Sequence, residues 1–173
     1  KMFELFGQEN AAEKAQTVLR LETRLANAAL SNVELRDPVA NYNKMSVEEL
    51  QKLVPEVDWK VYVAGLNIAP DSLSVGQVRH LQEAGKMLAE ESLEDMKTLF
   101  TWQVIDGSAD FLTEEIFMQN FEFYGRILSG RQEPTPLWKR AVAMVNGTLG
   151  EAVGQMYVEK YFPEENKERM IGL

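Results

Sequence analysis

The sequence predicts an all-α fold: a multi-helix domain built around one long C-terminal helix at about 137–162. Three observations indicate this. Apolar residues recur at intervals of three and four along almost the whole chain, which is the helical period. Capping motifs precede several of these segments. One apolar stripe continues through 137–162, and a helix of that length extends about 39 Å at 1.5 Å per residue, enough to span a small domain.

The segment at about 9–31 is expected to form the first helix, because its apolar residues lie on one face. These residues are Ala11, Ala15, Val18, Leu25 and Ala29. Glu22 occupies the vacant position of this stripe, which makes it a candidate buried carboxylate. A loop over 32–43 follows, in which Pro38 restricts Asp37 to an extended conformation.

Two short helices are expected after this loop. Ser46 and Glu49 form a capping box, which predicts a helix to about Leu53. A further helical turn or two begins at Pro55, and its apolar residues are Trp59, Tyr62 and Leu66.

The central stretch 67–78 allows a short extended piece, because a proline, a glycine and β-branched residues interrupt the helical pattern. Helix returns over about 77–89. Ser92 caps another helix, whose apolar face carries Met96, Leu99, Trp102 and Ile105. Thr113 opens the next helix, which is expected to end near Gly130, a good C-terminal stop.

The helix at 137–162 has the longest apolar stripe of the chain. Its members are Trp138, Ala141, Val142, Val145, Leu149, Ala152, Val153, Met156, Tyr157 and Tyr161. Gly147, Gly150 and Gly154 each cost roughly 1 kcal/mol of helix propensity relative to alanine. We therefore expect a neighbouring helix to approach closely at these glycines. Pro163 ends the stripe, and a last helix begins directly after it.

Length and composition indicate a single helical domain over residues 1–173. The 45% hydrophobic and 26% charged residues are a normal globular balance. The net charge of −9 disfavours binding to nucleic acid or an anionic membrane, since an acidic surface repels phosphate. No apolar run has the length of a membrane span or of a signal peptide's apolar region. The chain begins with Lys1 in mid-pattern, so we expect a fragment of a longer protein.

Two residue counts limit the chemistry of the chain. There is no cysteine, which excludes disulfides, thiolate zinc sites and iron–sulfur clusters. His80 is the only histidine, which excludes an H-E-x-x-H zinc motif or a pair of di-iron E-x-x-H motifs. His80 could serve as a general base or a lone ligand. Because no nearby motif supplies a nucleophile, a surface or half-buried histidine without a catalytic partner is the favoured interpretation.

Three other features have a structural and a functional interpretation. Glu22 is either an acid–base group or, more simply, the partner of Arg36 or Arg140 in a structural ion pair. Asn146-Gly147-Thr148 matches a glycosylation sequon, but it lies within a predicted helix, so chance explains it. The spacing of Gly150 and Gly154 fits a membrane-dimer motif, but charged residues nearby favour packing of soluble helices. The residues alone assign no catalytic, cofactor-binding or metal-binding position.

Five strings of residues, in register along the whole chain, identify a family resemblance. They are Arg36-Asp37-Pro38-x-x-x-Tyr42-Asn43-Lys44-Met45-Ser46, Pro55-x-x-Asp58-Trp59, Phe121-x-Phe123-Tyr124-Gly125-x-x-Leu128-x-Gly130, Trp138-Lys139-Arg140, and Val145-Asn146-Gly147-x-Leu149-Gly150-x-Ala152-x-Gly154-x-x-Tyr157-Val158-x-x-Tyr161-Phe162. Together they resemble the N-terminal, largely helical region of the neprilysin and endothelin-converting-enzyme family of zinc metallopeptidases.

The resemblance implies an endopeptidase acting on oligopeptides, with two helical lobes enclosing a chamber. It implies that zinc and the general-base glutamate belong to a catalytic lobe absent from this chain. No catalytic or metal residue is therefore carried over. Animal members commonly have a disulfide cysteine where this chain has Ala141. The lack of any cysteine therefore suggests a bacterial member, whose parent protein would work in the periplasm or at the cell surface.

The leading hypothesis is a piece of a zinc metalloendopeptidase that forms the helical lobe over the catalytic chamber, restricts substrate size and is inactive alone. Its partners would be the missing catalytic lobe and, through the parent, oligopeptide substrates. The alternative is a self-standing acidic helical module that binds a basic protein or peptide. A fragment is expected to expose apolar surface where its missing lobe packed, whereas a self-standing module is not. Exposed apolar surface therefore distinguishes the fragment hypothesis from the binding-module hypothesis. A cofactor-free acid–base enzyme using Glu22 or Asp110 lacks a second clustered group.

Overall fold

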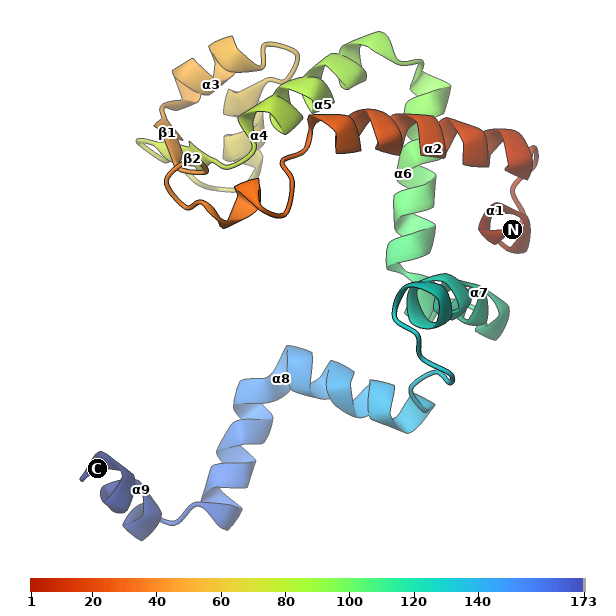
Figure 1. Ribbon diagram of the computed structural model, residues 1–173. Helices are drawn as coiled ribbons and strands as arrows, with labels where there is room; N and C mark the ends of the chain where they lie inside the picture. The colour runs from red at the N-terminus through yellow and green to blue at the C-terminus, as the bar shows by residue number, and fades with distance from the viewer. Residues whose placement is uncertain (173) are drawn as a thin grey trace. The chain divides into compact units, whose positions relative to one another are not determined.

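The computed structural model describes residues 1–172 and confirms the all-α prediction, with 69% of residues in helices and 3% in strands. The chain divides into two compact units (Figure 1): unit 1 is Lys1–Asn120, and unit 2 begins at Phe121. The expectation that residues 1–173 form a single domain stays a prediction.

Unit 1 contains nearly all the elements that the sequence predicts, in the predicted order. They are α1 (Met2–Leu5), α2 (Ala11–Ala28), η1 (Glu34–Arg36), β1 (Asn43–Met45), α3 (Val47–Leu53), α4 (Trp59–Gly65), β2 (Leu73–Val75), α5 (Val78–Glu90), α6 (Leu93–Gly107), η2 (Ala109–Phe111) and α7 (Glu114–Asn120). Helix α2 packs against both α5 and α6 (Figure 1).

The main core of unit 1 lies where α2 and α6 meet. Leu21, Leu99 and Ile105 are fully buried there, and Phe3 of α1 packs against Trp102 with ring centroids 5.9 Å apart. The predicted stripe of the first helix omits Leu21, which faces this core. The buried face of α2 therefore lies slightly to one side of the predicted one, and this displacement moves Glu22 out to the surface.

A second, smaller core joins α3, α4 and the two strands. Its buried residues are Val47, Leu50, Val54, Trp59 and Val75. Strands β1 and β2 pair antiparallel, with Lys44 opposite Ser74. The extended piece expected within 67–78 is thus confirmed as β2. Strand β1 lies just before the capping box and was not predicted. Its pairing depends on residues about thirty positions away, so the local apolar pattern gives no signal for a strand.

Predicted helix starts are confirmed in atomic detail. Ser46 Oγ accepts a hydrogen bond from the Glu49 amide at 3.2 Å, and Glu49 Oε2 accepts one from the Ser46 amide at 2.8 Å. This reciprocal pair is the capping box of α3. Ser92 Oγ likewise accepts a hydrogen bond from the Asp95 amide at 3.0 Å at the start of α6.

Unit 2 begins with the π-helix η3 (Phe121–Leu128), followed by α8 (Leu137–Tyr161) and α9 (Glu164–Ile171). The helix expected from Thr113 to near Gly130 is present in extent but changes to π geometry at Phe121. Its end is an αL cap: Gly130 has a φ of 66°, and its amide donates to the Arg126 carbonyl, while the Arg131 amide donates to the Gly125 carbonyl.

Helix α8 agrees with the predicted long helix to within one residue, but it is kinked. Leu149 has non-helical angles (φ −121°, ψ 21°), and Thr148 Oγ1 donates to the Met144 carbonyl at 2.8 Å, a bond that favours bending. The close helix approach expected at Gly147, Gly150 and Gly154 is not present within residues 1–172, since a Cβ at each would meet open space.

Candidate interaction surfaces

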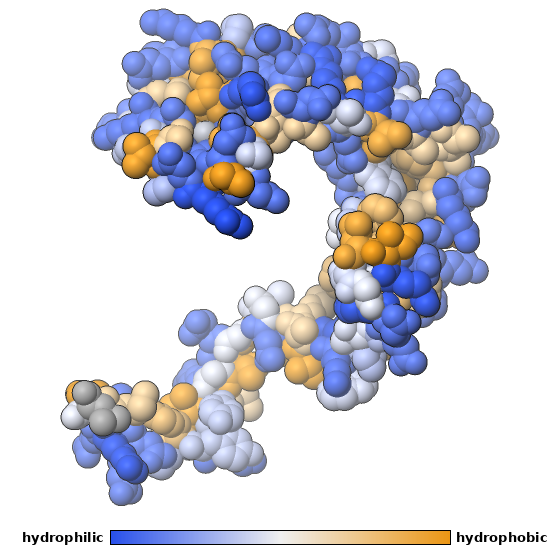
Figure 2. Space-filling view, in the orientation of Figure 1, coloured by the Kyte–Doolittle hydropathy of each residue, from blue (hydrophilic) through white to orange (hydrophobic). Residues whose placement is uncertain are grey.

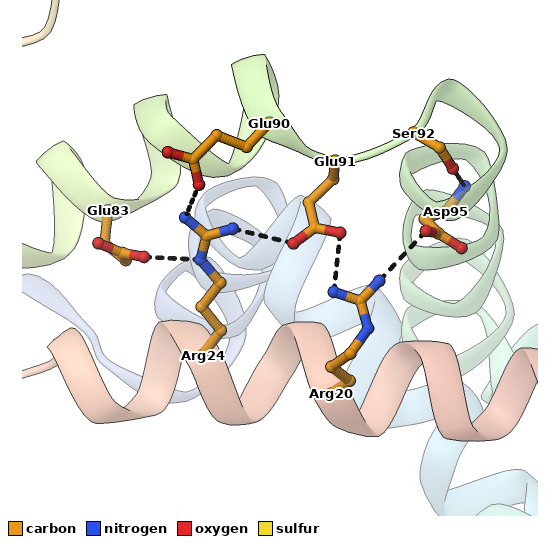
Figure 3. A network of polar contacts seen from close by, with 7 residues as sticks. All are labelled: Arg20, Arg24, Glu83, Glu90, Glu91, Ser92 and Asp95. Carbon is orange, nitrogen blue, oxygen red and sulfur yellow. Dashed lines mark hydrogen bonds and ion pairs between the residues drawn. The ribbon is translucent and has the colours of Figure 1, made fainter.

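An ion-pair network joins helix α5 to helix α2 (Figure 3). The Arg24 guanidinium contacts three carboxylates: Nε to Glu83 at 2.6 Å, Nη2 to Glu90 at 2.6 Å and Nη1 to Glu91 at 2.9 Å. Arg20 contacts Glu91 at 2.7 Å and Asp95 at 3.1 Å. One helix therefore presents two cations to the end of α5 and the start of α6.

These contacts change the titration of the carboxylates. The hydrogen bond from Arg24 lowers the pKa of Glu83, and the hydrogen bonds from Arg20 and then Arg24 lower the pKa of Glu91. The glutamates in turn raise the pKa of Arg24. Because all these groups are solvent-accessible, the network is a structural clamp rather than a proton-transfer site.

An apolar groove of about 660 Å³ lies in unit 1 beside this clamp. Its walls come from α4, β2 and α5, and its floor from Leu50 and Val54 of the second core. Among the described residues that line it, Ser74 is polar, Trp59 and Tyr62 are aromatic, and the rest are aliphatic or glycine. This volume falls within the range of ligand-binding clefts, and the lining is as apolar as theirs.

The aromatic wall of the groove is held rigidly. Trp59 Nε1 donates to the Val54 carbonyl at 2.9 Å, and the Trp59 amide donates to Gln51 Oε1 at 3.1 Å. The Tyr62 ring stacks edge-on against Trp59 with centroids 5.5 Å apart. The groove is therefore formed before anything binds in it.

Gly85 allows α5 to approach the floor closely. A Cβ at this position would overlap Cγ1 of Val54 and lie 2.9 Å from Oε2 of Glu56. The Glu56 carboxylate accordingly lies at the edge of the groove, over Gly85. Only a glycine permits this approach without displacement of α5.

A second apolar surface runs along α8 in unit 2. No residue of α8 is buried within the described chain. Seven large apolar side chains of the predicted stripe are between 45% and 71% exposed: Trp138, Val142, Val145, Leu149, Met156, Tyr157 and Tyr161. Figure 2 shows such apolar residues at the surface, interspersed with polar ones. A stripe of this extent on an isolated chain indicates a surface that another polypeptide covers.

His80 lies half-buried in a shallow hollow next to Asn41 and Gln77. No carboxylate or hydroxyl side chain is among the described residues that line this hollow. The arrangement gives the imidazole no partner for general-base chemistry and favours the structural interpretation.

The expectation that Glu22 is buried is wrong. Its side chain is exposed, and its Oε1 accepts a hydrogen bond from Trp102 Nε1 at 3.1 Å. Within unit 1, Glu22 therefore orients an indole of the main core and does not pair with Arg36, and its pairing with Arg140 of unit 2 stays a prediction. Asp110 is also exposed, in η2.

Within residues 1–172, no three histidine, cysteine or carboxylate side chains come together in a way that could hold a metal ion. With one histidine and no cysteine, this chain's residues do not fit a catalytic zinc. No helix in the described part is both long and apolar enough to cross a bilayer.

Relatives of the chain are zinc peptidases and neprilysin-like proteins. The chain is 30% identical to Neprilysin-2 of Drosophila melanogaster over 96% of its own length and 24% of that protein. It is 23% identical to Endothelin-converting enzyme-like 1 of Mus musculus over 98% of its length and 23% of that protein. The chain thus spans about a quarter of the length of the curated relatives it matches.

Solved structures agree with this relationship. The chain resembles the Mycobacterium tuberculosis zinc metalloprotease Zmp1 in its open state, with a TM-score of 0.90 and 35% identity, over 98% of this chain and 27% of that one. For the inhibitor complex of Zmp1 the TM-score is 0.82 and the identity 34%, over 93% of this chain and 25% of that one.

The sequence model of peptidase family M13 matches residues 1–173, the whole chain. This match agrees with the resemblance that the five strings indicate, and the relatives place the matched segment in the family's N-terminal region. The chain belongs to peptidase family M13, the neprilysin and endothelin-converting-enzyme family of zinc metallopeptidases.

Proposed function

We propose that this chain is part of a zinc metalloendopeptidase that hydrolyses oligopeptides, and that it forms the helical lobe enclosing the catalytic chamber and limiting substrate size. Membership of family M13 supports the peptidase activity of the parent. The exposed stripe of α8 carries the proposal that this chain is one part of a larger whole, because a self-standing module has no reason to leave so much apolar surface uncovered.

In this proposal zinc is held by the parent's catalytic lobe, which is also the partner that packs against this chain. The chain itself supplies walls and substrate exclusion and is inactive alone. The similarity to a mycobacterial enzyme and the absence of cysteine support a bacterial parent working in the periplasm or at the cell surface. The alternative is a self-standing acidic binding module, and sequencing of the encoding gene distinguishes it from the peptidase fragment.

The test is to sequence the encoding gene beyond Leu173. An in-frame continuation with an H-E-x-x-H motif and a downstream glutamate ligand supports the proposal. A stop codon directly after Leu173 overturns it and favours the binding module. A second measurement is peptide cleavage by the isolated chain with added zinc: we expect none, and zinc-dependent cleavage would contradict the assignment of the catalytic site to another lobe.

A further inference from the structure

We infer that the apolar groove between α4, β2 and α5 is a peptide-binding exosite, which takes an extended segment with an apolar side chain flanked by basic residues. The groove lies wholly within unit 1, and the described residues that line it include no histidine, cysteine or carboxylate that could bind a metal or activate the Ser74 hydroxyl. It therefore binds without reacting. As an assignment of substrate class it rests on the proposed function, but the binding itself can be measured without catalysis.

The first argument is the shape and rigidity of the groove. Its floor belongs to a packed core, and its Trp59 wall is held by two hydrogen bonds, so binding need not order the site. Around the opening, Tyr62, Leu66, Ile68 and Leu88 are each about half exposed. Such a rim of apolar residues around a preformed cleft is typical of a binding site for an apolar side chain.

The second argument concerns the strand. Three consecutive residues of β2, Leu73–Val75, line the groove. Successive side chains of a strand point to opposite faces, so a groove lined by all three runs along the strand's edge. Among the described residues, β2 is paired on one side only, with β1. An extended peptide can add to the free edge and place alternate side chains in the groove, a recurring mode of peptide recognition.

The third argument is charge complementarity. Lys60 pairs with Glu48 at 3.7 Å, Lys86 interacts with Glu83, and Lys52 interacts with Glu49. These three lysines are thus each near a carboxylate, whereas Lys44, opposite Ser74 on β1, has no carboxylate partner among the described residues.

Two carboxylates at the groove have no such partner within residues 1–172. Glu56 lies over Gly85, and Asp71 lies in the segment between the lining residues Pro70 and Leu73. Both are exposed. An apolar cleft flanked by unpaired carboxylates favours a peptide with lysine or arginine beside its apolar residue and disfavours an acidic one.

The probe is a fluorescein-labelled peptide with two central leucines flanked by a lysine and an arginine, titrated with the 173-residue chain at low and physiological salt. We expect saturable binding that weakens with salt. A matched peptide with glutamates in place of the two basic residues should bind about tenfold more weakly. A peptide with serines in place of the leucines should lose binding.

Variants of the chain locate the site. The double substitution Leu66→Lys/Leu88→Lys places charge on the rim at two exposed positions and should weaken binding by about tenfold or more. Glu56→Gln/Asp71→Asn should weaken it by a smaller factor and reduce its salt dependence. The control is Leu93→Lys, an exposed leucine of α6 outside the groove, which should bind like the unchanged chain. Circular dichroism checks that every variant is folded.

Two outcomes overturn the inference. One is the absence of saturable binding, or binding that Leu66→Lys/Leu88→Lys leaves unchanged. The other is a parent protein in which hydrogen exchange shows α4 and α5 protected relative to the isolated chain, with no peptide bound; then the groove is filled by the parent's own polypeptide. Peptide binding without any peptidase in the parent would instead overturn the proposed function and leave the groove assignment intact.

Discussion

The two units of this chain use the same helical periodicity to different ends. In unit 1 the apolar stripes of α2 and α6 face each other, and Leu21, Leu99 and Ile105 are fully buried. In the described part of unit 2, only Phe121 and Gly125 of η3 are buried, and the longest stripe of the chain, on α8, is exposed. The same apolar periodicity therefore accompanies a buried face in unit 1 and an exposed one on α8, and under the proposed function the element that covers α8 belongs to the parent's other lobe.

The most direct way to break this comparison is to shorten one side chain in each unit. Leu99→Ala leaves a cavity in the main core and should lower the free energy of unfolding by about 2–5 kcal/mol. Val142→Ala on the exposed stripe of α8 should change it by about 0.5 kcal/mol or less in this chain. Urea denaturation measures the difference, and hydrogen exchange assigns it to a unit.

Equal effects of these two substitutions would mean that α8 is as well packed as α6 and that the difference between the units is not real. The same two substitutions, made in the full-length parent, test the proposal that another lobe covers α8. There, a covered α8 should make Val142→Ala cost far more than it does in the isolated chain, because the removed methyl groups would then leave a cavity.

Glycine-to-alanine substitutions test whether unit 1 is closely packed and α8 is not, because the added methyl group needs space. Gly85→Ala forces a Cβ against Val54 and should destabilise unit 1 by about 1–3 kcal/mol. Gly150→Ala meets open space on α8 and should stabilise that helix by up to about 1 kcal/mol, since alanine has the higher helix propensity. Thermal unfolding monitored by circular dichroism compares them. Gly107→Ala is the control for adding a methyl group in unit 1 without a clash, because Gly107 lies in the last turn of α6 and a Cβ there would meet open space.

The sequence predicted most of the fold, because helix starts and stops are local. The capping box of Ser46 and Glu49, the cap at Ser92 and the stop at Gly130 all depend on residues within a few positions of one another. These signals are complete in the sequence, and the structure confirms each of them.

The groove and the position of Glu22 could not be predicted, because both depend on long-range packing. The groove needs β2 and α5 beside α4, and the contact of Glu22 with Trp102 joins residues eighty positions apart. The kink at Leu149 was also missed, although Thr148 and two nearby glycines carry a signal for it in the sequence. For the surfaces, the sequence predicted an exposed apolar face on a fragment but could not say which helix would carry it.

A smaller change in the free energy of unfolding is expected when a helix cap, instead of a core side chain, is removed in unit 1. Ser46→Ala removes the acceptor for the Glu49 amide and should lower the free energy of unfolding by about 1 kcal/mol. Ser74→Ala, at the exposed position of β2, should fall within about 0.5 kcal/mol of the unchanged chain and serves as the control. If the two serines behave alike in urea denaturation, the cap contributes nothing to the second core.

The smallest effect expected is the acid sensitivity of the clamp between α2 and α5. Because Arg24 lowers the pKa of Glu83 in the folded state, the unfolded state binds more protons at mildly acidic pH. The stabilisation is therefore complete above the ordinary glutamate pKa of about 4.3 and is lost as the pH falls through the lowered folded-state value.

Arg24→Gln should lower the unfolding midpoint at pH 7, and its effect should diminish as the pH falls through the lowered folded-state pKa of Glu83, below which the carboxyl group is protonated in both proteins. Lys97→Gln, which removes an exposed ion pair within α6, is the matched control and should shift the midpoint less. In hydrogen exchange corrected for intrinsic rates, acid should loosen α2 and α5, which Arg24 connects, before it affects α8. A loss of protection that begins in α8 would contradict the assignment of this stability to the clamp and place it in unit 2.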